Sequence, residues 1–289
     1  MTGTESFNMH SAPMRVGTVR LSVRDLDAVA AFYQSVLGLA PMDRGAGHML
    51  LGTGAVPLLE LAGDPSLAAN DPRQAGLFHT AFLMPSRADL ARWLAHAAAA
   101  GVALQGASDH IVSEAVYLAD PEGNGIEVYA DRPTSRWHDA TGAIRMATEP
   151  LDAQDLLAEA QGTPWSGFPA GGMIGHVHLQ VGDTAEADRF YTGILGLDIA
   201  TRYPGASFYG SGGYHHQLAG NVWNSRRAGP RPRGISGLDA VEIVLRDGDM
   251  LAAIAARAED AGLELGQESR GITLRDPWGT AFALTPGSR

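Results

Sequence analysis

Four polar features lie close together in residues 110–129, HIVSEAVYLADPEGNGIEVY: His110, Tyr117, an Asp-Pro-x-Gly turn and Glu127. Imidazole and carboxylate groups transfer protons and bind metal ions, and a phenol can hydrogen-bond to developing charge. Asp-Pro-x-Gly alone predicts only a tight reversal of the chain. The segment is therefore either an ordinary strand-turn-strand hairpin or one half of an active site.

The residue types that the chain lacks narrow the chemistry. It contains no Cys, which excludes disulfides, thiolate nucleophiles, Cys-ligated zinc and iron–sulfur clusters. All 21 basic residues are Arg, so Schiff-base chemistry and a phosphate-binding lysine are excluded as well. Catalysis would depend on His, Asp, Glu, Tyr and Ser, with ten His available.

The elements that position these groups are repeated along the chain. Residues 25–39 return as 183–197 with Phe-Tyr and Leu-Gly-Leu in the same places, and residues 76–104 return as 237–265. Both of the longer segments lead to an Asp-Pro-x-Gly turn. The two halves of the chain are therefore copies, and each half contains two units of roughly fifty residues.

Each unit begins with a short alternating apolar run, typical of a strand, and continues with a helical pattern and three short strands. This predicts an α+β fold of four β-α-β-β-β units, at 14–65, 76–130, 172–223 and 237–286. The predicted organisation is an N-terminal half (1–134), a connecting segment (135–170) and a C-terminal half (171–289).

Length and charge limit the partners. A chain of 289 residues that is 45% hydrophobic can bury two cores, and its net charge of −11 repels nucleic-acid phosphates.

The basic stretch 226–234 predicts a solvated loop, with a lid over an anionic ligand as the alternative. No run approaches the ~18 apolar residues of a membrane span, and residues 1–15 lack a signal-peptide pattern. We expect a cytoplasmic protein, a homo-oligomer, with no nucleic-acid or membrane partner.

Four such units resemble the vicinal oxygen chelate superfamily, which includes glyoxalases, bleomycin-resistance proteins and extradiol dioxygenases. The resemblance implies that paired units form two cupped mixed sheets, with metal ligands on the first and last strands of a unit. At those positions the second unit has His79 and Glu127 and the third has His176. The matching positions in the first and fourth units hold Thr18, Ala240 and Ala283.

Two imidazoles and one carboxylate form the facial triad that holds Fe(II) and leaves positions open for substrate and O₂. A single His on a strand is more often a hydrogen-bonded core residue than a metal ligand. Two His and one Glu at matched repeat positions instead favour a metal site. His178 faces the same side as His176. The distance to the following turn selects His176 as the ligand and leaves His178 as a supporting or core residue.

Two pairings of the units are possible. We expect the second and third units to share the metal cup, with the first and fourth units forming a metal-free companion. Pairing the first unit with the second, and the third with the fourth, would instead separate His176 from His79 and Glu127. It would place Glu60 in one cup and Glu242 in the other.

The segment 110–129 resembles the extradiol dioxygenase signature, in which His110 and Tyr117 would hydrogen-bond substrate and oxygen. YHHQLA at 214–219 resembles the stretch that carries the family's acid/base histidine, which maps onto His216. His215 alternates to the other face and is expected to be a surface or hydrogen-bonded residue. Nearly the whole chain is similar to the shorter bacterial catechol 2,3-dioxygenases.

This resemblance implies an Fe(II)-dependent oxidoreductase, with Mn(II) as the alternative metal, that cleaves an aromatic diol with O₂ to a 2-hydroxymuconic semialdehyde. Two other functions stay open at this point. One is a metal-dependent isomerase or lyase of the glyoxalase kind. The other is a small-molecule binding protein without catalysis, which would need no metal triad.

Overall fold

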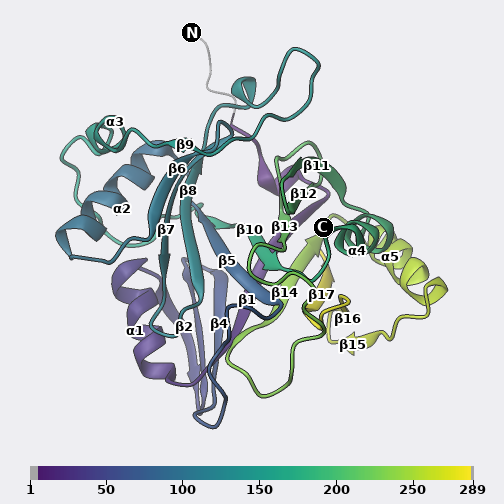
Figure 1. Cartoon of the computed structure of the whole chain (residues 1–289). Helices are drawn as coiled ribbons and strands as arrows, with labels where there is room; N and C mark the ends of the chain where they lie inside the picture. The colour runs from purple at the N-terminus through teal and green to yellow at the C-terminus, as the bar shows by residue number, and fades with distance from the viewer. Residues whose placement is uncertain (1–5, 288–289) are drawn as a thin grey trace.

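The computed structural model describes residues 6–287; the ends of the predicted halves, residues 1–5 and 288–289, lie outside the described residues. The chain forms two mixed β-sheets with helices packed on their outer faces (Figure 1). Four consecutive β-α-β-β-β modules build these sheets. The predicted α+β fold with four such units in two mixed sheets is confirmed.

The modules have the same order of elements. Module 1 contains β1 (Met14–Val23), α1 (Leu26–Val36), β2 (Ala40–Gly45), β3 (His48–Thr53) and β4 (Val56–Gly63). Module 2 contains β5 (Gly76–Leu83), α2 (Arg87–Ala99), β6 (Gly106–Asp109), β7 (Ser113–Ala119) and β8 (Gly125–Asp131). Module 3 contains β10 (Met173–Gln180), α4 (Thr184–Phe190), β11 (Asp198–Tyr203), β12 (Ala206–Gly210) and β13 (Leu218–Asn221). Module 4 contains β14 (Gly237–Leu245), α5 (Gly248–Asp260), β15 (Gly266–Glu268), β16 (Gly271–Arg275) and β17 (Ala281–Pro286).

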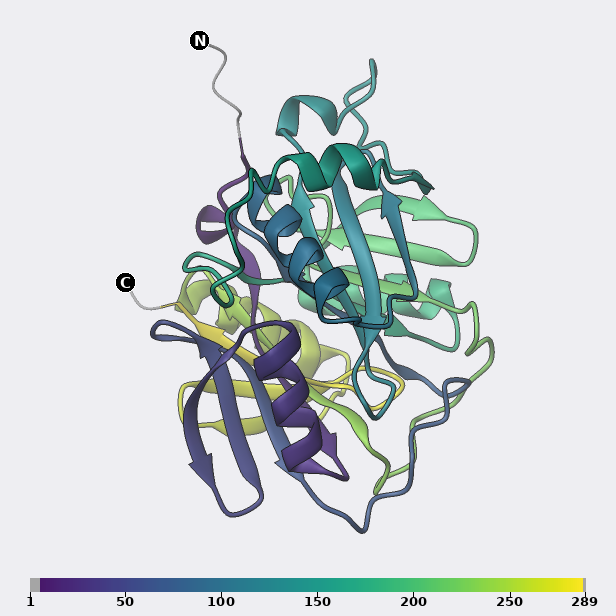
Figure 2. The same ribbon diagram turned by 90° about the vertical axis from the view of Figure 1, so that its left-hand side faces the viewer.

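Each sheet combines one module from the N-terminal half of the chain with one from the C-terminal half. One sheet has the order β15-β16-β17-β14-β1-β4-β3-β2 and so joins modules 4 and 1. The other has the order β11-β12-β13-β10-β5-β8-β7-β6-β9 and joins modules 3 and 2. We call them the outer sheet and the inner sheet. Figure 2 shows the purple and yellow modules side by side below the teal and green ones.

Local sequence signals explain where the module helices begin. Each of the four has a Ser or Asp at its N-cap whose side chain accepts a hydrogen bond from a backbone N–H in the first turn, as expected for a helix start. These residues are Asp25, Ser86, Asp183 and Asp247. Of the described helices, none is long and apolar enough to cross a membrane.

The connecting segment is more than a spacer. It contains a short 3-10 helix (Thr134–Arg136), β9 (Glu149–Pro150), which adds to the edge of the inner sheet beside β6, and α3 (Ala153–Ala158), which packs on α2. Arg87 of α2 bonds the buried Glu114 through two nitrogens and also reaches Asp155 of α3, at 2.7 Å. This ion-pair network fixes the connecting segment against the inner sheet.

The repeated Phe-Tyr and Asp-Pro-x-Gly motifs tie the two sheets together. The hydroxyl of Tyr191, at the end of α4, donates to the Asp276 carboxylate at 2.8 Å. In the other half, the Tyr33 hydroxyl of α1 lies 3.5 Å from Asp120 Oδ2. Each tyrosine lies in a module of one sheet and each aspartate in a module of the other, so the repeated residues contribute contacts between the two sheets.

We expect Tyr191→Phe to destabilise the protein, because it removes a donor from a buried carboxylate. A hydrogen bond to a charged group contributes about 1.5–3 kcal/mol. Tyr33→Phe is the matched control and should cost less, since its contact is longer. The urea midpoints of the two variants measure this difference, and equal losses would show that the hydroxyl of Tyr191 has no special role.

Candidate active site

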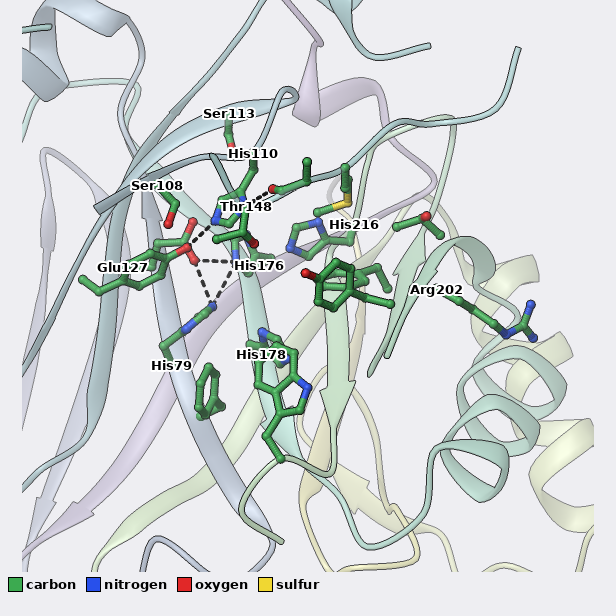
Figure 3. Close-up of a pocket in the computed structure, with 18 residues that line it drawn as sticks. His79, Ser108, His110, Ser113, Glu127, Thr148, His176, His178, Arg202 and His216 are labelled. Carbon is green, nitrogen blue, oxygen red and sulfur yellow. Dashed lines mark hydrogen bonds and ion pairs between the residues drawn. The ribbon is translucent and has the colours of Figure 1, made fainter. Parts of the chain in front are cut away.

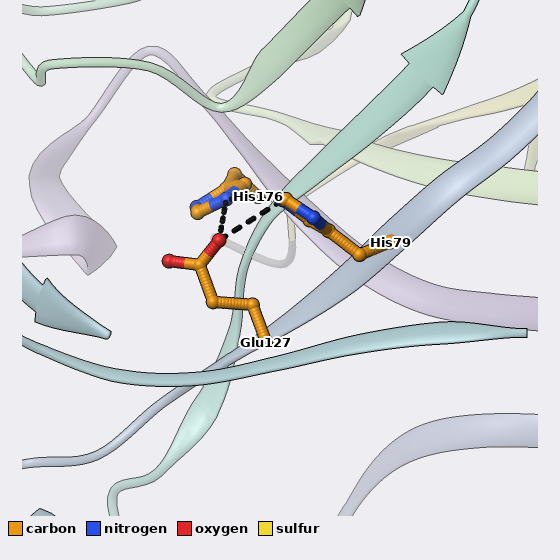
Figure 4. A group of neighbouring side chains, drawn as sticks. All are labelled: His79, Glu127 and His176. Carbon is orange, nitrogen blue, oxygen red and sulfur yellow. Dashed lines mark hydrogen bonds and ion pairs between the residues drawn. The ribbon is translucent and has the colours of Figure 1, made fainter. Parts of the chain in front are cut away.

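Three candidate ligands meet on neighbouring strands at the centre of the inner sheet. His79 comes from β5, Glu127 from β8 and His176 from β10, and β5 lies between the other two strands. Glu127 Oε2 lies 3.0 Å from His79 Nε2 and 3.4 Å from His176 Nε2, and the two Nε2 atoms are 3.3 Å apart (Figure 4). All three side chains are buried. The predicted residues are thus brought together in one cluster.

The electrostatics of the cluster suit a cation. Burial lowers the pKa of His176 to about 4, so at neutral pH its imidazole is uncharged and keeps a free lone pair. Burial opposes ionisation of Glu127, but His176 and His79 hold the pKa of its carboxyl well below the ordinary value. A carboxylate and a neutral imidazole are the states in which Glu127 and His176 can bind a metal ion. The ligand atoms lie within 4.8 Å of one another, which fits one shared ion.

The matching positions of the outer sheet hold no such cluster within the described residues 6–287. Glu242 accepts hydrogen bonds from the Thr18 backbone N–H and the Thr285 hydroxyl, at 3.0 and 2.9 Å. Glu60 forms an ion pair with Arg20 at 2.9 Å. These carboxylates are therefore engaged in ordinary structural contacts, and they lie in a different sheet from His79 and His176.

His110 and Tyr117 form a second pair beside the cluster. A carbonyl oxygen only accepts, so His110 Nδ1 donates to the Ala147 carbonyl, at 2.6 Å. In that tautomer His110 Nε2 accepts a hydrogen bond from the Tyr117 hydroxyl, also at 2.6 Å. Burial, together with nearby Glu127, raises the pKa of Tyr117 well above its ordinary value. Both ring nitrogens of His110 are therefore engaged by protein groups, and the Tyr117 hydroxyl is the neighbouring polar group on the cavity lining.

The other histidines line the same region. His216 is buried, and its ring centroid lies 4.1 Å from that of His176. His178 accepts a hydrogen bond from the Asn221 amide at 3.0 Å, consistent with a supporting residue. His215 is fully buried and bonded to Asp131 at 2.9 Å, so of its two expected placements the hydrogen-bonded one holds and the surface one does not.

A cavity of about 300 Å³ opens over these groups (Figure 3). Its polar side carries the His-Glu-His cluster, His110, Tyr117 and His216. Four aromatic side chains also line the cavity: Phe78, Tyr203, Phe208 and Trp223. Arg202 lies at the exposed rim, where it is paired with Asp188 at 3.0 Å. The cavity thus combines polar groups with aromatic surfaces against which an aromatic ring could pack.

Several lining residues were not identified from sequence. Met146, Ala147 and Thr148 of the connecting segment close one side of the cavity, yet their turn-rich sequence has no periodicity to indicate this. Trp223 lies two residues after β13, and its closeness in sequence to His216 was an available signal. No residue of 226–234 lines the cavity; Arg231 instead donates to the Leu238 carbonyl at 2.8 Å.

The chain is similar to known proteins both in sequence and in fold. Residues 15–128 and 173–284 match the Glyoxalase/Bleomycin resistance protein/Dioxygenase superfamily. Over 274 residues the chain is 40% identical to a catechol-2,3-dioxygenase of Bacillus subtilis strain 168, covering 92% of this chain and 95% of the relative. Glyoxalase I from Zea mays is 16% identical with a TM-score of 0.59, covering 96% of this chain and 94% of that one. The cppA protein of Streptococcus pneumoniae is 10% identical with a TM-score of 0.58, covering 96% and 99%. These two structures show a shared fold.

Proposed function

Because the chain belongs to the glyoxalase/bleomycin resistance protein/dioxygenase superfamily, the vicinal oxygen chelate proteins, we propose that it is an extradiol dioxygenase that cleaves a catechol-type ring. The observation that carries this proposal is the convergence of His79, Glu127 and His176 in one buried cluster at the floor of the cavity. The relative named catechol-2,3-dioxygenase supports it across nearly the whole chain.

His79, Glu127 and His176 would hold Fe(II), with Mn(II) as the alternative. When bound, the metal would supply open positions for two adjacent ring oxygens and for O₂, and a route for electrons between them. The reaction adds both atoms of O₂ to the catechol, so it requires no outside reductant. We propose the same three ligands for either metal.

His216 is the proposed acid/base residue. Burial, with neighbouring His176 next in effect, lowers its pKa well below the ordinary value, so it is neutral and able to accept a proton from a ring hydroxyl. Its Nδ1 is engaged by His215, at 2.8 Å, which leaves Nε2 for the substrate. The accepted proton would return to the ring-opened product.

Tyr117 and the aromatic lining position the substrate. The Tyr117 proton is directed to His110, so the phenol oxygen offers its lone pairs to a ring hydroxyl. Phe78 and Trp223 lie 5.4 Å apart in an edge-to-face arrangement and would pack against the apolar ring. The aromatic lining exposes no charge deep in the cavity, which favours an uncharged aromatic diol.

Anaerobic loading with Fe(II), followed by catechol and air, tests the proposal. We expect a yellow ring-opened product with the Fe(II) protein, and loss of activity after oxidation to Fe(III), because O₂ binds only where the metal can donate an electron. Protein loaded with Zn(II) is the matched control and should be inactive. Equal turnover with Zn(II) would contradict the proposal and favour an isomerase of the glyoxalase kind.

A further inference from the structure

Three side chains form a hydrogen-bonded row that ends at the cavity. Asp131, the last residue of β8, lies 2.9 Å from His215 Nε2. His215 Nδ1 lies 2.8 Å from His216 Nδ1. His216 then lines the cavity. The sequence motifs predicted His216 but gave no role to either of the residues behind it.

The order of donors and acceptors in this row has one solution when both rings are neutral. A carboxylate only accepts, so His215 must carry its proton on Nε2 and donate to Asp131. A neutral imidazole has one proton, so His215 Nδ1 is an acceptor. The contact between the two Nδ1 atoms then requires His216 to carry its own proton on Nδ1. His216 Nε2 is left without a proton.

The surroundings hold the row in this arrangement. The Tyr214 hydroxyl donates to the same Asp131 oxygen at 3.2 Å, and Tyr129 lies 2.8 Å from the Tyr214 hydroxyl. Trp137 packs edge-on against the His215 ring, with centroids 4.9 Å apart. His215 is completely buried, so bulk water does not compete for its nitrogens. His215 and His216 are buried, whereas the Asp131 side chain keeps an exposed fraction of 12%.

We infer that Asp131 and His215 are positioning residues that fix His216 in the tautomer with its proton on Nδ1, so that the Nε2 lone pair serves as the base. This inference deepens the proposed function. The tautomer is argued from the hydrogen bonds alone, whereas the role of Nε2 as the base rests on the proposed function. When a ring O–H bond breaks and an N–H bond forms at His216 Nε2, the new positive charge lies at the end of a row that terminates in a carboxylate. The row therefore stabilises the protonated base as well as its starting tautomer.

The tautomer is directly measurable by NMR of protein labelled with ¹⁵N-histidine and loaded with diamagnetic Zn(II). We expect the His216 resonances, assigned with His216→Gln, to show a protonated Nδ1 and a bare Nε2. Asp131→Asn can donate to His215 Nε2 and so reverse the row; we expect it to move the His216 proton to Nε2. With Fe(II), it should lower kcat by up to the about 10²–10⁴-fold that general acid–base assistance contributes, and change KM little.

Asp276→Asn is the matched control, since it also alters a buried aspartate that is bonded to a tyrosine, but in the outer sheet. It should leave both the His216 tautomer and kcat unchanged. A bare Nδ1 on His216 in the unsubstituted protein would overturn the inference even if the variants fail to fold. An unchanged kcat in folded Asp131→Asn would also overturn it. Because the NMR measurement needs no turnover, absence of ring cleavage would count against the proposed function alone.

Discussion

Replacement of His79 or His176 with alanine is expected to abolish iron binding and, with it, ring cleavage. Each substitution removes one of the three proposed ligands, and the Nε2 atoms of the two residues lie only 3.3 Å apart. Changes to residues that merely support a ligand typically cost about 10- to 100-fold in metal affinity or activity. Loss of a proposed ligand should therefore lower the affinity for iron by more than about 100-fold. Iron content after anaerobic loading and gel filtration measures the binding directly.

Glu60→Ala and Glu242→Ala are the controls for this experiment. Both remove a carboxylate from the outer sheet, where Glu60 pairs with Arg20 and Glu242 accepts from Thr18 and Thr285. We expect the two variants to retain iron. Iron loss in either, with retention in the His79 variant, would place the metal in the outer sheet and refute the proposed site.

His216→Ala should separate metal binding from catalysis. The variant keeps all three proposed ligands, so its iron content should match that of the unsubstituted protein. It loses the proposed base, and general acid–base assistance typically contributes about 10²–10⁴-fold. Single-turnover measurements with catechol and O₂ should show a loss of that size in the chemical step. If iron content falls in parallel with activity, His216 is a metal ligand and not the base.

The internal repeat is the reason why so much of the fold could be predicted from the sequence. Four copies of one pattern define the modules, and the comparison between copies selects His79, Glu127 and His176 as the polar exceptions. The structure brings these three residues into one cluster. Their role as metal ligands is still a prediction, as is the oligomeric state.

Features that depend on irregular backbone escaped the sequence patterns. The expected placement of His215 relied on strand alternation, but residues 211–217 form the turn between β12 and β13, where that rule does not apply. Asp131 gains its role only because the end of β8 meets this turn. Ala147 orients His110 from the turn-rich first part of the connecting segment, whose sequence has no periodicity to indicate this contact. Each of these contacts joins segments that are distant in sequence.

Modules 2 and 3 form one sheet and modules 1 and 4 the other, and this order has a consequence for synthesis on the ribosome. The inner sheet is complete once module 3 has emerged, because its modules are consecutive. In the outer sheet, β1 pairs with β4 of its own module, but its other edge pairs with β14, where Met14 meets Leu245. That edge of β1 therefore stays open while more than two hundred further residues are made. An open edge of a hydrophobic strand invites wrong pairing, so the nascent chain is most vulnerable in the sheet that carries none of the proposed chemistry.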